Sequence, residues 1–254
     1  MAHGDSELGT PKTEAVYTAL AALFVVVLVL TNIIGVKLFA LFPEGRPSWL
    51  GGGDALTLTT GIITYPITFL LTDIVAEIWG RKRASFMVIL GFGMSLLMLG
   101  LLFMARTLPP SPIWSNPSMG VETAEAMQHA FDVTFSTPHI LLGASMTAYL
   151  VAQLFDVRLY HFWWGLTGGK HMWLRNNGST AISQLVDTII VNGIFLRWGL
   201  DMEWPVIWEI ILTIYVCKLI LAVIDTPLIY LGRYLLRSWF GLAHDDAPAH
   251  APLA

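Results

Sequence analysis

The chain has 254 residues, of which 55% are hydrophobic and only 13% are Asp, Glu, Lys or Arg. Soluble domains carry about 25% charged residues, so this chain has too little polar surface to coat a globule of its size. Its only cysteine, Cys217, excludes an intrachain disulfide and a cysteine zinc cluster, and its net charge of −4 gives no reason to expect nucleic-acid binding. The composition therefore excludes a soluble enzyme, a secreted disulfide scaffold and a disordered chain.

Six apolar stretches are long enough to cross a bilayer, because a helix needs about 20 mostly apolar residues to span the hydrocarbon core. Apolar residues follow one another without alternation, for example from Ala21 to Leu30, which argues against the strands of a transmembrane barrel. We therefore expect an all-α membrane protein with six transmembrane helices. In chain order these are Ala15–Leu41, Ala55–Ile78, Ala84–Ala105, Pro138–Asp156, Thr180–Leu200 and Pro205–Gly232.

The distribution of lysine and arginine predicts the orientation, because cytoplasmic loops carry an excess of both. With the N-terminus inside, nine lie on the cytoplasmic side, namely Lys12, Arg81, Lys82, Arg83, Arg158, Lys170, Arg175, Arg233 and Arg237. Four lie on the opposite side, namely Lys37, Arg46, Arg106 and Arg197. Both termini are therefore expected in the cytoplasm, with an N-terminal segment at 1–14, a six-helix transmembrane domain at 15–235 and a disordered tail at 236–254.

A long outer loop, Arg106–Thr137, joins the third and fourth expected spans. It contains prolines near its start and then Val121–Phe131, for which we expect a short surface helix.

Polar side chains in the first two spans are candidates for ligand contact. Asn32 in the first span suits either helix packing or a ligand, and Tyr65 beside Pro66 suits either packing or stacking on a flat ligand. Asp73 and Glu77 are four residues apart and so share a helix face. Charged side chains inside a membrane normally face the protein interior or a cavity, which favours a functional role for Asp73. Glu77 suits either such a role or an ion pair with Arg81, four residues later.

The fifth span carries a row of polar residues. Gln184, Asp187, Thr188 and Asn192 fall on one stripe of a helix. Lipid offers no hydrogen-bond partner, so this stripe must face protein. It serves either as a network that joins helices or as a site, and Asp187 is the strongest single candidate for substrate binding.

The sixth span contains Lys218 and Asp225, which share a face but lie two turns apart. Each needs a partner on another span or on a ligand, and Asp187 with Lys218 is one plausible pair. Pro227 cannot bond the carbonyl of Val223, so a helix break is expected there. Broken helices often mark transporter sites, although an ordinary kink is the alternative. On the expected topology five polar residues from three spans occupy the cytoplasmic half of the membrane, which is the main sequence argument for a shared site. They are Asp73, Glu77, Gln184, Asp187 and Asp225.

The same residues carry a family likeness. The segment Tyr65–Asp73, followed by Glu77, resembles the queuosine precursor transporter family, also called the vitamin uptake transporter family, and so does Arg175–Thr188. Lys218 with Asp225–Pro227 resembles the family's last span. The resemblance implies a bacterial inner-membrane importer of 7-cyano-7-deazaguanine or 7-aminomethyl-7-deazaguanine. It also implies a fold similar to the substrate-binding components of energy-coupling-factor vitamin transporters.

On this interpretation the partners are a small deazapurine and the lipid bilayer, with no nucleic acid, no cofactor and no metal, and a homo-oligomer stays open. The expected substrate-binding residues are Asn32, Tyr65, Asp73, Glu77, Gln184, Asp187, Asn192, Lys218 and Asp225. The chain contains no P-loop motif, which favours coupling to an ion or proton gradient over ATP hydrolysis by the chain itself. A vitamin-type component that needs a separate ATPase module and a membrane assembly subunit are the alternatives. An intramembrane enzyme is disfavoured, because the motifs Gly-x-Ser-x-Gly and His-Glu-x-x-His are absent.

Overall fold

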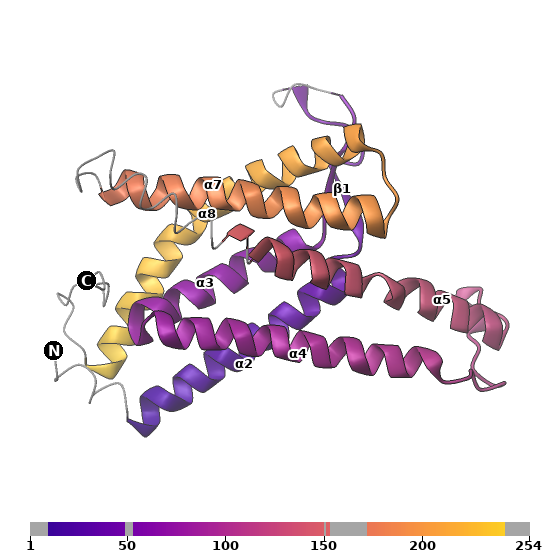
Figure 1. The fold of residues 1–254 in the computed structure, drawn as a ribbon, viewed down its shortest axis with the longest axis horizontal. Coiled ribbons are helices and arrows are strands. Elements are labelled where there is room, and N and C mark those ends of the chain that lie inside the picture. Colours follow the sequence, from indigo (N-terminus) through magenta and orange to yellow (C-terminus); the bar gives the residue numbers. More distant parts are fainter. Residues whose placement is uncertain (1–9, 49–52, 150, 153–171, 242–254) are drawn as a thin grey trace. The chain divides into compact units, whose positions relative to one another are not determined.

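The computed structural model describes residues 10–48, 53–149, 151–152 and 172–241 (Figure 1). These residues are mainly helical. In chain order the elements are α2 (Pro11–Ile34), β1 (Leu38–Leu41), β2 (Leu56–Thr59), α3 (Gly61–Trp79), α4 (Arg81–Thr107), η2 (Pro117–Met119), α5 (Ala124–Ser136), helical residues 138–149 and 151–152, α7 (Met172–Ile194), the π-helical turn η3 (Phe195–Gly199) and α8 (Trp204–Phe240).

Three described helices are long and apolar enough to cross a membrane, at Pro11–Ile34, Lys82–Thr107 and Trp204–Ile224. The apolar helix Gly61–Ala76 is shorter. These helices confirm the expected first, third and sixth spans as helices of membrane-spanning length. The full count of six spans stays a prediction, because part of the expected fourth span and the segment before the fifth lie outside the described residues.

The expected first span ends too late in the sequence, and the expected second span begins too early. Helix α2 ends at Ile34, and the residues that follow form a strand instead of a last helical turn. Strand β1 pairs antiparallel with β2, with Leu38 opposite Thr59 and Leu41 opposite Leu56. The physical reason is that a short apolar run suits a strand as well as a helix, so hydropathy alone does not separate them.

The hairpin is fastened to the end of α2 by Thr60. The Thr60 hydroxyl donates to the Ile34 carbonyl, which has no partner within the helix, and its backbone N–H donates to the Lys37 carbonyl at 2.9 Å. Helix α3 then begins at Gly61 instead of the expected Ala55.

The last helix is longer than the sequence suggests. Helix α8 continues without interruption through Pro227, so the break expected there is wrong. A proline removes one backbone hydrogen bond without ending a helix when the flanking turns keep theirs. The helix also runs on to Phe240, beyond the expected end of the span at Gly232.

The described residues fall into two compact units. The first unit comprises the described parts of Met1–Thr31, Gly61–Leu96 and Lys218–Ala254, and the second those of Asn32–Thr60 and Leu97–Cys217. In the first unit, Phe24, Val75, Trp79 and Met87 are buried in a core shared by α2, α3 and α4. A Cβ on Gly91 would lie 2.7 Å from Leu28 Cδ2 and 2.9 Å from the Phe24 ring, so side chains of α2 pack on α4 where α4 has no side chain of its own.

Aromatic and ionic contacts hold the ends of the helices in the first unit. The Trp79 ring lies 5.8 Å from the ring of Tyr17 and 5.8 Å from that of Phe240, measured between centroids. Arg83 forms a two-pronged ion pair with Glu14 at 2.6 and 2.8 Å. These contacts join the start of α2, the α3–α4 corner and the end of α8.

Part of the core of the second unit is formed by the first half of α8, which runs beside α7 in Figure 1. The isoleucines at 207, 210, 211 and 214 follow helical spacing and are buried, as are Phe195 and Leu196 of η3. The Tyr215 hydroxyl donates to the Ala181 carbonyl at 3.1 Å, which ties α8 to α7.

The expected surface helix of the outer loop is confirmed, with shifted bounds. Helix α5 begins after Thr123, whose hydroxyl accepts a hydrogen bond from the backbone N–H of Ala126. Arg106 at the end of α4 bonds the Asp132 carboxylate at 3.1 Å, and Gln128 donates to the other carboxylate oxygen at 3.1 Å. These bonds fix α5 against the end of α4.

Candidate functional site

A buried cation lies over an aromatic ring in the first unit. Lys218, on α8, is only 9% exposed, and its Nζ atom is 4.7 Å from the centroid of the Tyr65 ring. This geometry is a cation–π contact, in which the ammonium is attracted to the negative face of the ring. Tyr65 lies on α3, so the contact joins two helices that are far apart in the sequence.

A second aromatic ring extends this cluster along α3. The centroids of Tyr65 and Phe69 are 4.2 Å apart, with the ring planes tilted by 34°. Residues four apart on a helix are neighbours on one face, so the two rings and Lys218 form one patch. We call Tyr65, Phe69 and Lys218 the aromatic–lysine cluster. It combines flat apolar surfaces with one hydrogen-bond donor that carries positive charge.

Threonines line the same helix, and their hydroxyls are bonded. Thr64 lies 2.7 Å from Thr31 of α2, hydroxyl to hydroxyl, and Thr64 also donates to the Gly61 carbonyl at 2.9 Å. Thr68 and Thr72 donate to carbonyls of their own helix, Thr68 to that of Tyr65 and Thr72 to that of Thr68. The contact of Thr31 with Thr64 was not predicted from the sequence. The spacing of threonine at 64, 68 and 72 was the available signal.

The acidic candidates on α3 and α8 are only partly described. Asp73 lies in the second half of α3 and is exposed at the surface of the first unit. Glu77 and Asp225 belong to α3 and α8 respectively, and their side chains lie outside the described part of the chain. Their roles therefore stay predictions, as does the pairing of Glu77 with Arg81.

The polar row of the fifth expected span lies on α7, in the second unit. Thr188 and Asn192 are buried, as expected for a stripe that faces protein. The Thr188 hydroxyl donates to the Gln184 carbonyl at 2.7 Å, and Asn192 Nδ2 donates to the Thr188 carbonyl at 2.9 Å. Gln184 and Asp187 are half-buried. Thr188 and Asn192 therefore each donate a hydrogen bond to a carbonyl of their own helix.

The structure brings together some candidates and leaves others as predictions. Tyr65 and Lys218 are in contact, and Gln184, Asp187 and Asn192 share one helix. Asn32 is buried in the second unit. Asp187 and Lys218 belong to different units, so their proposed pairing stays a prediction.

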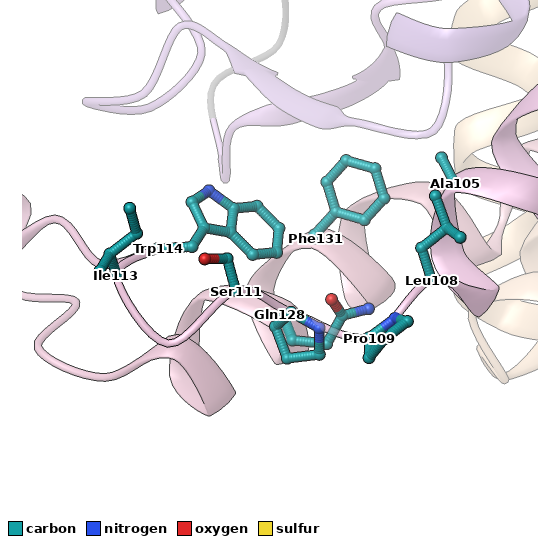
Figure 2. Close-up of a pocket in the computed structure, with 9 residues that line it drawn as sticks. Ala105, Leu108, Pro109, Ser111, Ile113, Trp114, Gln128 and Phe131 are labelled. Atoms are coloured by element: carbon teal, nitrogen blue, oxygen red, sulfur yellow. The ribbon is translucent and has the colours of Figure 1, made fainter.

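Among the described residues, no group of three or more His, Cys, Asp or Glu side chains is placed to hold a metal ion. A pocket of about 520 Å³ opens on the outer loop, far along the chain from the aromatic–lysine cluster. In Figure 2 the rings of Trp114 and Phe131 lie next to each other, with Pro109 and Gln128 below them and Leu108 and Ile113 toward opposite ends.

Comparison with known proteins indicates a transporter family. The family described as "Putative vitamin uptake transporter" matches residues 59–232, a range that contains Tyr65, Asp187 and Lys218. A protein of Bacillus subtilis (strain 168) named "Probable queuosine precursor transporter" is 30% identical over 184 residues, which cover 71% of this chain and 74% of that protein. No solved structure matches the chain.

Proposed function

This chain belongs to the vitamin uptake transporter family, and on that premise we propose that it imports queuosine precursors across the bacterial inner membrane. The proposed substrates are 7-cyano-7-deazaguanine and 7-aminomethyl-7-deazaguanine. Support for this substrate class comes from the name of the Bacillus subtilis relative and from the chemistry of the aromatic–lysine cluster.

The observation that carries the proposal is the position of Lys218 over Tyr65. A deazaguanine is a flat ring with a carbonyl oxygen on one edge. Tyr65 and Phe69 offer aromatic faces on which such a ring stacks, because offset stacking of aromatic systems is favourable. Lys218 offers N–H donors to the carbonyl oxygen and is held in place by the tyrosine ring. The cluster thus supplies two of the interactions that recognition of a purine-like base requires.

The polar row on α7 is proposed to accept hydrogen bonds from the substrate, whereas Lys218 is proposed to donate one. The Watson–Crick edge of a deazaguanine carries N–H donors, which a carboxylate accepts well because charge-assisted hydrogen bonds are the stronger ones. Asp187 is the proposed acceptor, with Gln184 and Asn192 beside it on α7. Asn32, Asp73, Glu77 and Asp225 complete the proposed set of substrate-binding residues.

We propose that transport is driven by an ion or proton gradient, without an ATPase partner and without enzymatic chemistry. Asp73 and Asp187 are the described carboxylates proposed to carry the proton. The proposed topology keeps six spans with both termini in the cytoplasm, and it agrees with three described helices of membrane-spanning length.

A genetic test distinguishes this function from others. The gene is expressed in a bacterium that must import queuosine precursors and lacks its own importer, and queuosine in tRNA is measured after feeding each precursor. Restored queuosine is the expected result. Unmodified tRNA, with the protein detected in the membrane, would contradict the proposal.

A vitamin-type substrate-binding component is the second candidate, favoured by the description of the matching family. Such a component works only with a separate ATPase module. Rescue in a host from which energy-coupling-factor modules have been deleted would exclude this candidate, whereas rescue that depends on such a module would support it.

A further inference from the structure

The outer-loop pocket lies where a membrane-spanning helix ends. Helix α4 is long and apolar enough to cross the bilayer up to Thr107, and Leu108 directly after it lines the pocket. The other walls come from the loop after α4 and from α5, with Trp114 and Phe131 as the largest side chains (Figure 2). The pocket is therefore expected at the depth of the membrane–water interface, where tryptophan is enriched.

An apolar stripe of α4 runs directly into this pocket. Leu97, Leu101 and Met104 are spaced by four and three residues, which places them on one side of the helix, and Leu108 follows directly after the helix ends. Each of these side chains is more than half exposed. On a helix that crosses a bilayer, an exposed apolar stripe is the surface that contacts lipid chains. The pocket thus continues the lipid-facing surface of α4.

The loop beyond the stripe presents further apolar side chains outward. Ile113 is 89% exposed and lies at one end of the pocket, and Met119 is 78% exposed. Large apolar side chains that extend an apolar surface in this way mark an interaction surface, because water contact with them is unfavourable. We call Leu108, Ile113, Trp114 and Met119 the interfacial patch.

The charged groups at the base of the loop are already paired. Arg106 bonds Asp132, and Gln128 bonds both Asp132 and the Arg106 carbonyl. These bonds orient α5 so that Phe131 faces the pocket. They also pair the charges of Arg106 and Asp132, which lowers the cost of placing this region near lipid.

We propose that the interfacial patch docks on the bilayer surface at the end of α4, with Ile113 inserted among the acyl chains and the outer-loop pocket filled by a phospholipid chain. The occupant is lipid because the surface is continuous with the lipid-facing stripe of α4 and because its exposed side chains are apolar. Docking would hold the 106–137 loop at a fixed height relative to the membrane-spanning helices. The proposal depends on α4 crossing the membrane and not on which substrate is transported.

A fluorescent label at position 113 tests the proposal. Cys217 is the only cysteine, so Cys217→Ala provides a cysteine-free background. Ile113→Cys and, as a matched control, Ala126→Cys are each labelled with an environment-sensitive fluorophore. Ala126 is exposed on the side of α5 turned away from Gln128 and Phe131. Both proteins are reconstituted into phosphatidylcholine vesicles with and without brominated acyl chains.

The label at position 113 is expected to emit at shorter wavelength and to lose most of its fluorescence to brominated chains, while the label at position 126 keeps its fluorescence. A label at position 113 that stays water-exposed and unquenched would overturn the proposal. So would a change in that label on adding 7-aminomethyl-7-deazaguanine without quenching by lipid, because the pocket would then hold a small molecule. Hydrogen exchange of unlabelled protein provides a second measurement, with slow exchange of residues 108–116 expected in lipid nanodiscs and fast exchange contradicting docking.

Discussion

Lys218 Nζ lies 4.7 Å from the centroid of the Tyr65 ring, so a charged side chain of a membrane-spanning helix is held by the face of an aromatic ring. A charged residue near the bilayer centre costs about 2.5–3.5 kcal/mol on insertion scales. A desolvated cation–π contact contributes about 2 kcal/mol. The ring therefore offsets much of this cost.

Substitutions at Tyr65 separate the ring from its hydroxyl. Tyr65→Phe keeps the aromatic face under Lys218, and we expect uptake close to that of the wild type. Tyr65→Leu removes the face, and we expect uptake to fall about thirtyfold, since loss of a contact of roughly 2 kcal/mol corresponds to that factor. Initial rates of precursor uptake at matched protein levels measure both. Equal uptake by the two variants would contradict a role for the Tyr65 ring in transport.

Asp187 is expected to be essential for transport. The substitution Asp187→Asn keeps the shape of the side chain but removes the charge, and we expect loss of tRNA rescue with normal membrane insertion. Asp201→Asn is the matched control, because Asp201 is exposed between η3 and α8 and pairs only with Arg197 four residues earlier among the described contacts. The control should rescue fully. Full rescue by Asp187→Asn would show that this carboxylate is not part of the site.

Two glycines of α4 are expected to respond oppositely to alanine. A Cβ on Gly91 would lie 2.7 Å from Leu28 and 2.9 Å from Phe24, whereas nothing lies within 4 Å of a Cβ on Gly93. Gly91→Ala should therefore destabilise the protein by about 1–3 kcal/mol through overpacking. Gly93→Ala should stabilise it by about 0.5–1 kcal/mol through helix propensity. Thermal unfolding in detergent measures both, and a stabilised Gly91→Ala variant would contradict the close packing of α2 and α4.

Asp132 is expected to make the order of the outer loop depend on pH. Hydrogen bonds from Gln128 and then from Arg106 hold the pKa of Asp132 below its ordinary value. Because the pKa is lowered in the folded state, the contribution of this carboxylate is present above the unfolded pKa and is lost as the pH falls through the folded one. Pepsin cleavage of the 106–137 loop should therefore rise at the acid end of its range.

Because the activity of pepsin itself changes with pH, cleavage is measured relative to an unfolded reference substrate digested in parallel. On that scale the variant Asp132→Asn should show a smaller change with pH than the wild type, since it has no carboxylate at position 132 to protonate. Glu125→Gln, on the exposed first turn of the same helix, is the control and should keep the pH dependence of the wild type. A wild-type loop whose cleavage does not change with pH would contradict the role given to Asp132.

Apolar composition predicts most of the helices but not their ends. Helix α4 matches the expected third span closely, since a long apolar run bounded by arginines has few alternatives. The hairpin of β1 and β2 was missed because four apolar residues after Gly35 suit a strand or a last helical turn equally well. Its formation depends on pairing with residues about 20 positions later, which local hydropathy does not report.

Part of the candidate site could likewise be predicted from the sequence, and part could not. Helical spacing alone predicted that Gln184, Asp187 and Asn192 lie on one stripe, because the relative directions of side chains on one helix follow from their positions in the sequence. The contact of Tyr65 with Lys218 was not foreseen, since it depends on how α3 packs against α8. Both residues were nevertheless candidates, because polar and aromatic groups within apolar helices are uncommon and need partners.

Uptake by vesicles tests the central claim most directly. The purified protein is reconstituted into liposomes, and labelled 7-cyano-7-deazaguanine and 7-aminomethyl-7-deazaguanine are supplied with and without an imposed proton gradient. We predict accumulation of at least one of the two above its outside concentration when the gradient is present, and collapse of that accumulation on adding a protonophore. Vesicles that contain folded protein and take up neither compound, with or without the gradient, would contradict the account.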